Sequence, residues 1–170
     1  MRRAIPMVVT LTLLSCTTDP PAATRGAQMV VNAVNKRGVS VGFVEVGPGV
    51  AHAVWHSPNG AMIDLGTLPG GSRSSAVAID DLGTIVCQSE TARGAFRAVR
   101  WRHGLIEDLG TLPGGDFSVA SAIDGDAVFG ESDAGDGVLH AFRWQEGRMT
   151  DLGRISAPAG GAPRPRSDRR

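Results

Sequence analysis

The eight-residue stretch DLGTLPGG occurs twice in this chain, at residues 64–71 and 108–115. A third, divergent copy begins at Asp151 and reads DLGRISAPAGG. The copies lie 44 and 43 residues apart. This spacing falls within the roughly 40–50 residues of one β-propeller blade. The period therefore predicts equivalent units that each pack against the next one.

The repeated stretch contains its own turn. Proline fixes φ and glycine accepts positive φ, so the Pro-Gly-Gly at 69–71 and 113–115 predicts a turn between units, with both glycines at positive φ. We expect Gly70 and Gly114 to hold conformations poorly open to other residues. The preceding DLG supplies the repeated glycines Gly66 and Gly110. Its aspartates Asp64, Asp108 and Asp151 are interpreted as structural residues of the connection, with a ring of ligands as the alternative.

Four short apolar segments separated by turn residues recur in each unit. The first segments end in Asn or Asp, at 31–35, 76–80 and 120–124, and the second occupy 39–44, 84–89 and 127–132. A third segment holds a tryptophan, and a short fourth ends at DLG. Four strands joined by hairpin turns make an antiparallel blade. We predict an all-β fold of three propeller-blade-like repeats of about 44 residues, near 28–71, 72–115 and 116–153, that form an incomplete, open propeller.

The tryptophans Trp55, Trp101 and Trp144 are predicted to anchor the core, with sugar-stacking platforms as the alternative. The first repeat departs from the others, because HAVW places Trp55 one residue earlier than RAVRW and HAFRW place theirs. A shift of one residue moves a strand side chain to the opposite face. Either a bulge restores the register, or Trp55 is placed differently from the other two.

The first 15 residues are predicted to be a signal peptide. Arg2 and Arg3 precede a largely apolar run of 11 residues at 4–14, which is too short to span a bilayer. The sequence Leu13-Leu14-Ser15-Cys16 that follows resembles a bacterial lipobox, which implies lipidation of Cys16 and a membrane partner through the lipid. Thr17 follows in place of Asp, which favours the outer membrane or cell surface over the inner membrane. Residues 16–27 are interpreted as a flexible tether, and residues 154–170 as a disordered tail.

Composition narrows the possible partners. Residues 17–153 hold 10 basic and 16 acidic residues, a net charge of −6, which argues against a nucleic-acid partner. If Cys16 carries lipid, Cys87 is left without a second cysteine. Its strand-like context TIVCQS predicts a buried, inert thiol.

The HAFRW segment, the glycine turn, DLGTLPGG and the AID-like strand together resemble the HAF-type extracellular repeat family. The resemblance covers roughly residues 29–153, and His-Ala-Phe itself is intact at 140–142. It implies an exported bacterial protein with β-rich, propeller-like repeats and no established reaction. It carries over no catalytic residue.

No residue pattern indicates a catalytic, cofactor or metal site. His52 and His56 have the spacing of a zinc helix, but Ala53 replaces the glutamate and the segment is strand-like. The acidic residues at 124–136 lack the spacing of a calcium-binding EF-hand loop. The arginines Arg97, Arg100 and Arg102 are interpreted as surface charges, with a site for anionic glycans as the alternative.

These observations predict a cell-envelope lipoprotein that acts as a non-catalytic β-repeat binding or scaffold module. The alternative is a propeller-type hydrolase or lyase that acts on envelope or extracellular glycans. Propellers close with about four to eight blades, so three repeats leave two open blade edges. We therefore expect either an open arc of marginal stability or, preferably, self-association into a dimer whose two arcs build six blades.

Overall fold

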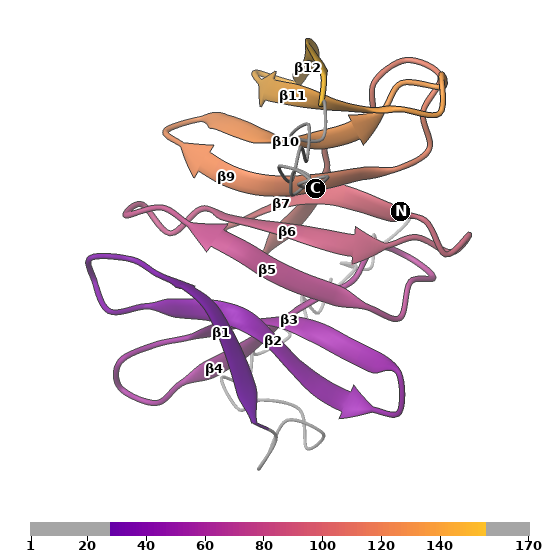
Figure 1. The fold of residues 1–170 in the computed structure, drawn as a ribbon. Coiled ribbons are helices and arrows are strands. Elements are labelled where there is room, and N and C mark those ends of the chain that lie inside the picture. Colours follow the sequence, from indigo (N-terminus) through magenta and orange to yellow (C-terminus); the bar gives the residue numbers. More distant parts are fainter. Residues whose placement is uncertain (1–27, 156–170) are drawn as a thin grey trace, which may run out of the picture.

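The structure, a computed structural model, describes residues 28–155, which form twelve β-strands (Figure 1). The strands make three four-stranded antiparallel sheets, and residues 28–155 contain no helix. The all-β prediction is confirmed. The predicted signal peptide, the lipidation site Cys16, the tether and residues 156–170 of the predicted tail lie outside the described residues.

Each sheet is a meander whose strands follow one another in chain order. Sheet 1 contains β1 (Met29–Val34), β2 (Ser40–Gly47), β3 (Val50–His56) and β4 (Met62–Gly66). Sheet 2 contains β5 (Ser74–Ile79), β6 (Ile85–Glu90), β7 (Phe96–Arg102) and β8 (Leu105–Asp108). Sheet 3 contains β9 (Ser118–Asp124), β10 (Ala127–Asp133), β11 (Leu139–Gln145) and β12 (Arg148–Arg154). The three sheets stack in sequence order, as the change of colour in Figure 1 shows.

The aspartate of each DLG holds a local turn in the backbone. Its Oδ1 atom accepts a hydrogen bond from the amide of the glycine two residues later, at 2.8 Å in Asp64, 2.9 Å in Asp108 and 2.7 Å in Asp151. Gly66, Gly110 and Gly153 all have positive φ, a region that glycine enters without steric cost. The three aspartates therefore act locally, each within its own sheet.

The Pro-Gly-Gly turn needs its two glycines for different reasons. Gly70 and Gly114 have φ of +78° and +86°, which confirms the predicted conformation. The prediction that the second glycine also has positive φ is wrong. A Cβ on Gly71 would lie 1.9 Å from the carbonyl oxygen of Glu90, and one on Gly115 would lie 1.8 Å from that of Asp133. The second glycine is therefore required by the close approach of the next sheet.

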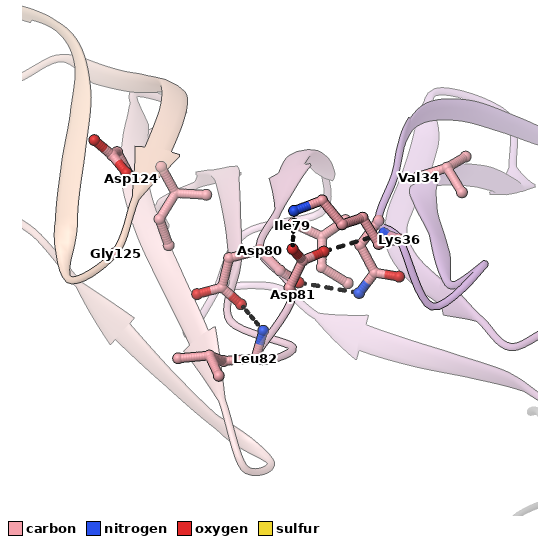
Figure 2. A pocket seen from close by; sticks show the side chains of 10 residues that line it. Val34, Lys36, Ile79, Asp80, Asp81, Leu82, Asp124 and Gly125 are labelled. Carbon is pink, nitrogen blue, oxygen red and sulfur yellow. Dashed lines mark hydrogen bonds and ion pairs between the residues drawn. The ribbon is translucent and has the colours of Figure 1, made fainter.

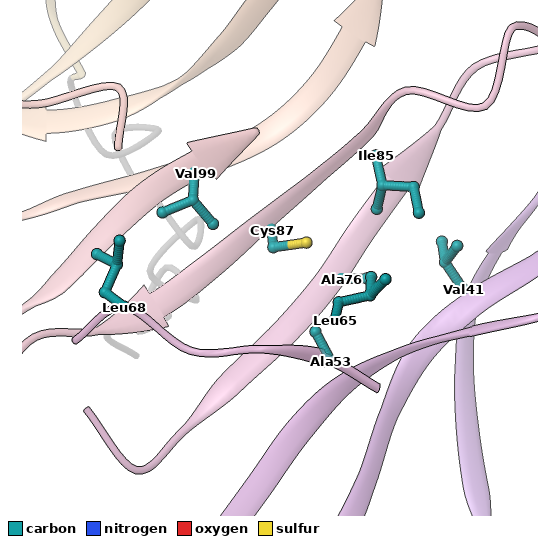
Figure 3. Packing of buried hydrophobic residues seen from close by; sticks show 8 residues of the cluster. All are labelled: Val41, Ala53, Leu65, Leu68, Ala76, Ile85, Cys87 and Val99. Carbon is teal, nitrogen blue, oxygen red and sulfur yellow. The ribbon is translucent and has the colours of Figure 1, made fainter. Parts of the chain in front are cut away.

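Two apolar clusters join the three sheets. Sheets 1 and 2 share a cluster that includes Leu65, Leu68, Ile85 and Val99, together with Cys87 (Figure 3). Burial raises the pKa of the Cys87 thiol to about 12 by desolvation, so the predicted burial is confirmed and the thiolate is disfavoured. Sheets 2 and 3 share a second cluster, formed by Val86, Ala98, Leu109, Leu112, Ala120, Val128, Phe142 and Trp144.

Trp55 lies on the opposite face of its sheet from the other two tryptophans. Trp55 directly follows Val54 and pairs with Val41. Trp101 comes two residues after the equivalent Val99 and pairs with Ile85, so the two rings lie one position apart in the strand pairing. No bulge lies between residues 52 and 56 in the β2–β3 pairing, so the register is not restored. Trp55 and Trp101 consequently pack on the same cluster between sheets 1 and 2. Trp144 is buried between sheets 2 and 3 under the guanidinium of Arg100, 4.5 Å from the ring centroid, so it cannot serve as a sugar platform.

Buried serines bond each sheet to the one before it. Ser74 Oγ accepts a hydrogen bond from Ala53 N at 2.8 Å and donates one to Gly66 O at 2.6 Å. Ser89 Oγ accepts one from Leu68 N at 2.8 Å. The same contacts recur between sheets 3 and 2, where Ser118 bonds Ala98 N and Gly110 O, and Ser132 bonds Leu112 N. Each hydroxyl satisfies backbone groups that would otherwise be buried without a partner.

Candidate functional site

Three equivalent turns meet at one end of the first strands and line a single cleft (Figure 2). The turns join β1 to β2, β5 to β6 and β9 to β10, so each sheet contributes one of them. The cleft has a volume of about 490 Å³. Its lining consists of Val34, Asn35, Lys36, Ile79, Asp80, Asp81, Leu82, Ile123, Asp124 and Gly125.

The first two turns are held by the side chain that starts them. Asn35 Oδ1 accepts hydrogen bonds from the amides of Arg37 and Val39, at 3.0 and 3.1 Å. Asp80 Oδ1 does the same for Leu82 and Thr84, at 2.9 and 2.7 Å. Short polar side chains at the start of a turn favour this local bonding.

The third turn is shorter and leaves its carboxylate available. Asp124 pairs with Ala127 across the hairpin, and Gly125 has φ of +57°. Within residues 28–155, no hydrogen bond reaches the Asp124 carboxylate, which is exposed. Asp124 is therefore the acidic group of the cleft with the most freedom to meet a ligand.

The turns of sheets 1 and 2 are tied together across the cleft. Asn35 Nδ2 donates a hydrogen bond to the carbonyl oxygen of Asp80 at 3.0 Å. Lys36 bonds Asp81 twice, through its amide at 3.1 Å and its ammonium at 3.0 Å. These contacts with Lys36 hold the pKa of Asp81 below its ordinary value. This side of the cleft is thus fixed by bonds that sequence reasoning did not anticipate.

The cleft combines negative charge with exposed apolar surface. Its lining holds three carboxylates, Asp80, Asp81 and Asp124, and one cation, Lys36, which is already paired with Asp81. Val34 and Leu82 are 60% and 78% exposed. A site of this composition is complementary to a ligand that carries a protonated amine next to a short apolar group. The repeat-aligned Asn35, Asp80 and Asp124 all lie in this cleft, although their alignment alone did not predict it.

Two of the three sheets contain a bonded histidine–aspartate pair. His52 Nδ1 lies 2.8 Å from Asp64 Oδ2, and His140 Nδ1 lies 2.8 Å from Asp151 Oδ2. In both sheets the pair joins the third strand to the DLG aspartate. Because the contact recurs at equivalent positions, we interpret it as part of the repeat framework. The contact also accounts for the histidine of the HAF segment.

The His140 pair gives a pH prediction. The hydrogen bond with Asp151, supported by Asp136, raises the pKa of His140, while a bond from Gly153 N and the contact with His140 lower that of Asp151. The stabilisation should be complete below the ordinary histidine pKa and lost as the pH rises through the raised folded-state pKa. It should also be lost when acid protonates Asp151. Titration of the His140 Cε1 proton by NMR should show the raised pKa, and Asp151→Asn should lower it. An unchanged titration curve in Asp151→Asn, with Asp116→Asn as control, would contradict this assignment.

Sheet 2 carries Arg97 at the position of these histidines. Its Nε atom is buried and has no hydrogen-bond partner within residues 28–155, while Asp108 keeps its local bond to Gly110. Arg97→His should create a His–Asp108 pair and stabilise the protein by about 0.5–1 kcal/mol. Urea denaturation would measure the gain. The gain should vanish when Asp108→Asn is added. The variant Arg97→Ala removes the buried Nε without adding a histidine, so it measures how much of the gain comes from that removal alone.

Several of the arginines and acidic residues that the sequence suggested as ligand sites make contacts of their own outside the cleft. Arg100 pairs with Glu107 at 2.6 Å and Arg102 lies 3.7 Å from Asp126, so neither arginine is an uncommitted surface cation. Asp133 Oδ1 accepts a bond from Gly135 N, and Asp136 pairs with Arg154. No group of three or more His, Cys, Asp or Glu side chains among residues 28–155 is arranged to hold a metal ion. That part of the chain also has no helix of the length and apolarity that would cross a membrane.

Comparisons with protein-family models, with curated proteins and with solved structures found no match for this chain. The geometry of its own residues is therefore the basis for assigning a function.

Proposed function

We propose that this chain is a non-catalytic binding or scaffold module of the cell envelope, built as a propeller-like arc of three HAF-type repeats. Support for the arc comes from the meander order of each sheet and from the packing of the sheets in sequence order. The first strands β1, β5 and β9 also lie next to one another, as the inner strands of neighbouring blades do. The motif residues make recurrent structural contacts, as the equivalent units of a repeat do.

The cleft formed by the three turns is the observation that carries the binding function. Every sheet supplies one turn, so the cleft depends on all three repeats. Repeat proteins place binding surfaces where equivalent parts of successive repeats line up. The ligand of the cleft carries a protonated amine beside an apolar group, as a lysine-containing peptide does.

A peptide titration tests this binding function. The full chain, labelled with ¹⁵N, is titrated with the peptide Ala-Lys-Ala and, in parallel, with Ala-Glu-Ala. We expect Ala-Lys-Ala alone to shift the amides of residues 79–82 and 123–125. Asp124→Asn should weaken its binding about fivefold, which corresponds to ~1 kcal/mol for an exposed ion pair.

Asp116→Asn is the matched control, because Asp116 is exposed and precedes the opposite end of β9. It should leave the titration unchanged. Equal shifts with Ala-Glu-Ala, or shifts confined to residues outside the cleft, would contradict the proposed site.

Attachment to the envelope rests on Cys16 and its lipobox-like context. A lipid on Cys16 would hold the arc at the outer membrane or cell surface, separated from it by residues 17–27. Labelling with palmitate in a bacterial host should mark the wild-type chain and fail to mark Cys16→Ser. A Cys16→Ser chain that still takes up the label and stays with membranes would contradict the anchor.

A further inference from the structure

Among residues 28–155, no element packs on the face of sheet 3 that points away from sheet 2. This face carries Leu152 and Ile155, which are 55% and 39% exposed. These residues are equivalent to Leu109 and Leu112 of sheet 2, which are 6% and 2% exposed under sheet 3. Leu65 and Leu68 of sheet 1 are buried in the same way under sheet 2. Sheet 3 thus retains the apolar residues that the other two sheets use to receive a following sheet.

The two internal interfaces show what such a following sheet must supply. At both interfaces, the first strand of the following sheet begins with a serine. Its hydroxyl lies between an alanine amide and the carbonyl of the DLG glycine of the preceding sheet. The equivalent groups in sheet 3 are those of Ala141 and Gly153, which pair across β11 and β12. A second serine pairs directly with the first across the two strands, as Ser74 does with Ser89 and Ser118 with Ser132.

Sheet 1 of this chain does not carry these serines. Met29 and Val44 form the equivalent cross-strand pair, and neither side chain offers a hydroxyl. His56 also stands where Trp101 and Trp144 stand in the other sheets. A second copy docked through sheet 1 would therefore leave the hydroxyl positions on sheet 3 unfilled.

From these equivalences we infer that the outer face of sheet 3, defined by Ala141, Leu152, Gly153 and Ile155, docks a four-stranded repeat sheet of a partner chain that carries the paired serines. The partner's first serine bonds Ala141 N and Gly153 O, and its apolar strands cover Leu152. Ile155 N presently bonds Leu139 O at 2.9 Å. The second serine therefore binds only after Ile155 leaves the edge of β11, as Leu68 and Leu112 turn toward the serines of sheets 2 and 3.

The inference is tested by giving the chain a fourth sheet of each kind. In one protein, residues 1–153 are followed by a second copy of residues 67–110, so that Leu68 of the copy takes the place of Ile155 and the copy brings the linker, sheet 2 and both serines. In the matched protein, residues 1–153 are followed by residues 67–71 and then by a second copy of residues 28–66. A third protein repeats the first with alanine at both serines of the added copy. Hydrogen exchange at the Ala141 amide and the chemical shifts of the Leu152 methyl groups report docking.

We expect the serine-carrying copy to slow exchange at Ala141 about tenfold or more and to shift the Leu152 methyl signals. In the proteins with the copy of sheet 1 or with the alanine substitutions, the exchange rate at Ala141 and the Leu152 methyl shifts should stay near their values in the parent chain. Equal protection by the copy of sheet 1 would overturn the inference in favour of a second copy of this chain as the occupant. Absence of protection in all three proteins, including the case of an added copy that stays unfolded, would overturn it altogether.

Discussion

Gly115→Ala should destabilise the protein by about 3 kcal/mol or more. A Cβ at this position would lie 1.8 Å from the carbonyl oxygen of Asp133 and 2.6 Å from its carbonyl carbon. Both contacts are with backbone, so no side chain can rotate to relieve them. The link between sheets 2 and 3 would have to move away from β10, which would also disturb the bond from Leu112 N to Ser132. Urea denaturation followed by tryptophan fluorescence measures the loss.

Gly47→Ala is the matched control for this experiment. Gly47 does not have positive φ, and a Cβ there would lie no closer than 4.0 Å to another atom. Its substitution should change the free energy of unfolding by less than about 0.5 kcal/mol. Gly71→Ala should repeat the large loss at the other interface, where the added carbon would lie 1.9 Å from Glu90 O. A loss at Gly115 no larger than that at Gly47 would show that the two sheets separate without strain.

Ser118→Ala should destabilise the protein by about 2 kcal/mol. The Ser118 hydroxyl accepts a hydrogen bond from Ala98 N at 3.0 Å and donates one to Gly110 O at 2.6 Å, and the serine is fully buried. Alanine would remove the hydrogen-bond partner of both buried backbone groups. The cost is therefore set by the unsatisfied groups and exceeds the net value of the hydrogen bonds themselves. Differential scanning calorimetry should record a lowered Tm.

Ser121→Ala controls for the loss of a hydroxyl from the same strand. Ser121 is exposed at the irregular position of β9, opposite the step between Phe129 and Gly130. Its substitution should leave the Tm within about 1 °C of the wild type. Equal effects of the two substitutions would mean that the hydroxyl of Ser118 does not join the sheets.

The serines and the glycine turns together determine which face of one sheet packs on which face of the next. Sheets 1 and 2 supply backbone donors and acceptors on the side that faces the next sheet, and sheets 2 and 3 supply hydroxyls on the side that faces the previous sheet. Sheet 1 lacks the hydroxyls and sheet 3 lacks a following sheet among residues 28–155, so the two ends of the stack differ in chemistry. The early position of Trp55 has the same consequence, because it moves the ring from the leading face of sheet 1 into the interface with sheet 2.

Much of the local structure could be predicted from residue spacing. Alternating apolar residues between turn residues indicated the four strands of each unit, and the Pro-Gly-Gly stretch indicated a turn with positive φ at Gly70 and Gly114. The burial of Cys87 followed from its place within a strand. The serines repeat as well, since Ser74 and Ser118 lie 44 residues apart and Ser89 and Ser132 lie 43 apart, but their spacing does not show which backbone groups they bond.

The candidate cleft could not be predicted in the same way. Asn35, Asp80 and Asp124 end the first apolar segment of each repeat, but this position does not reveal which other turns they lie near. That Lys36 bonds Asp81, and that Asp124 is left without a hydrogen bond among residues 28–155, depends on the distance and angle between whole sheets. The direction of Trp55 depended likewise on whether β3 contained a bulge, which spacing alone left open.

The sequence by itself determined the period, the strands, the turns and the all-β class, because these depend on contacts between residues that are close in the chain. Only the tertiary structure decided why Gly71 and Gly115 cannot carry a side chain, which face Trp55 occupies, and which turns share a cleft. Each of these depends on where one sheet lies against the next. Gly115 shows the difference most clearly: it does not have the positive φ that favours glycine, and it is the carbonyl of Asp133 in the following sheet that excludes a side chain.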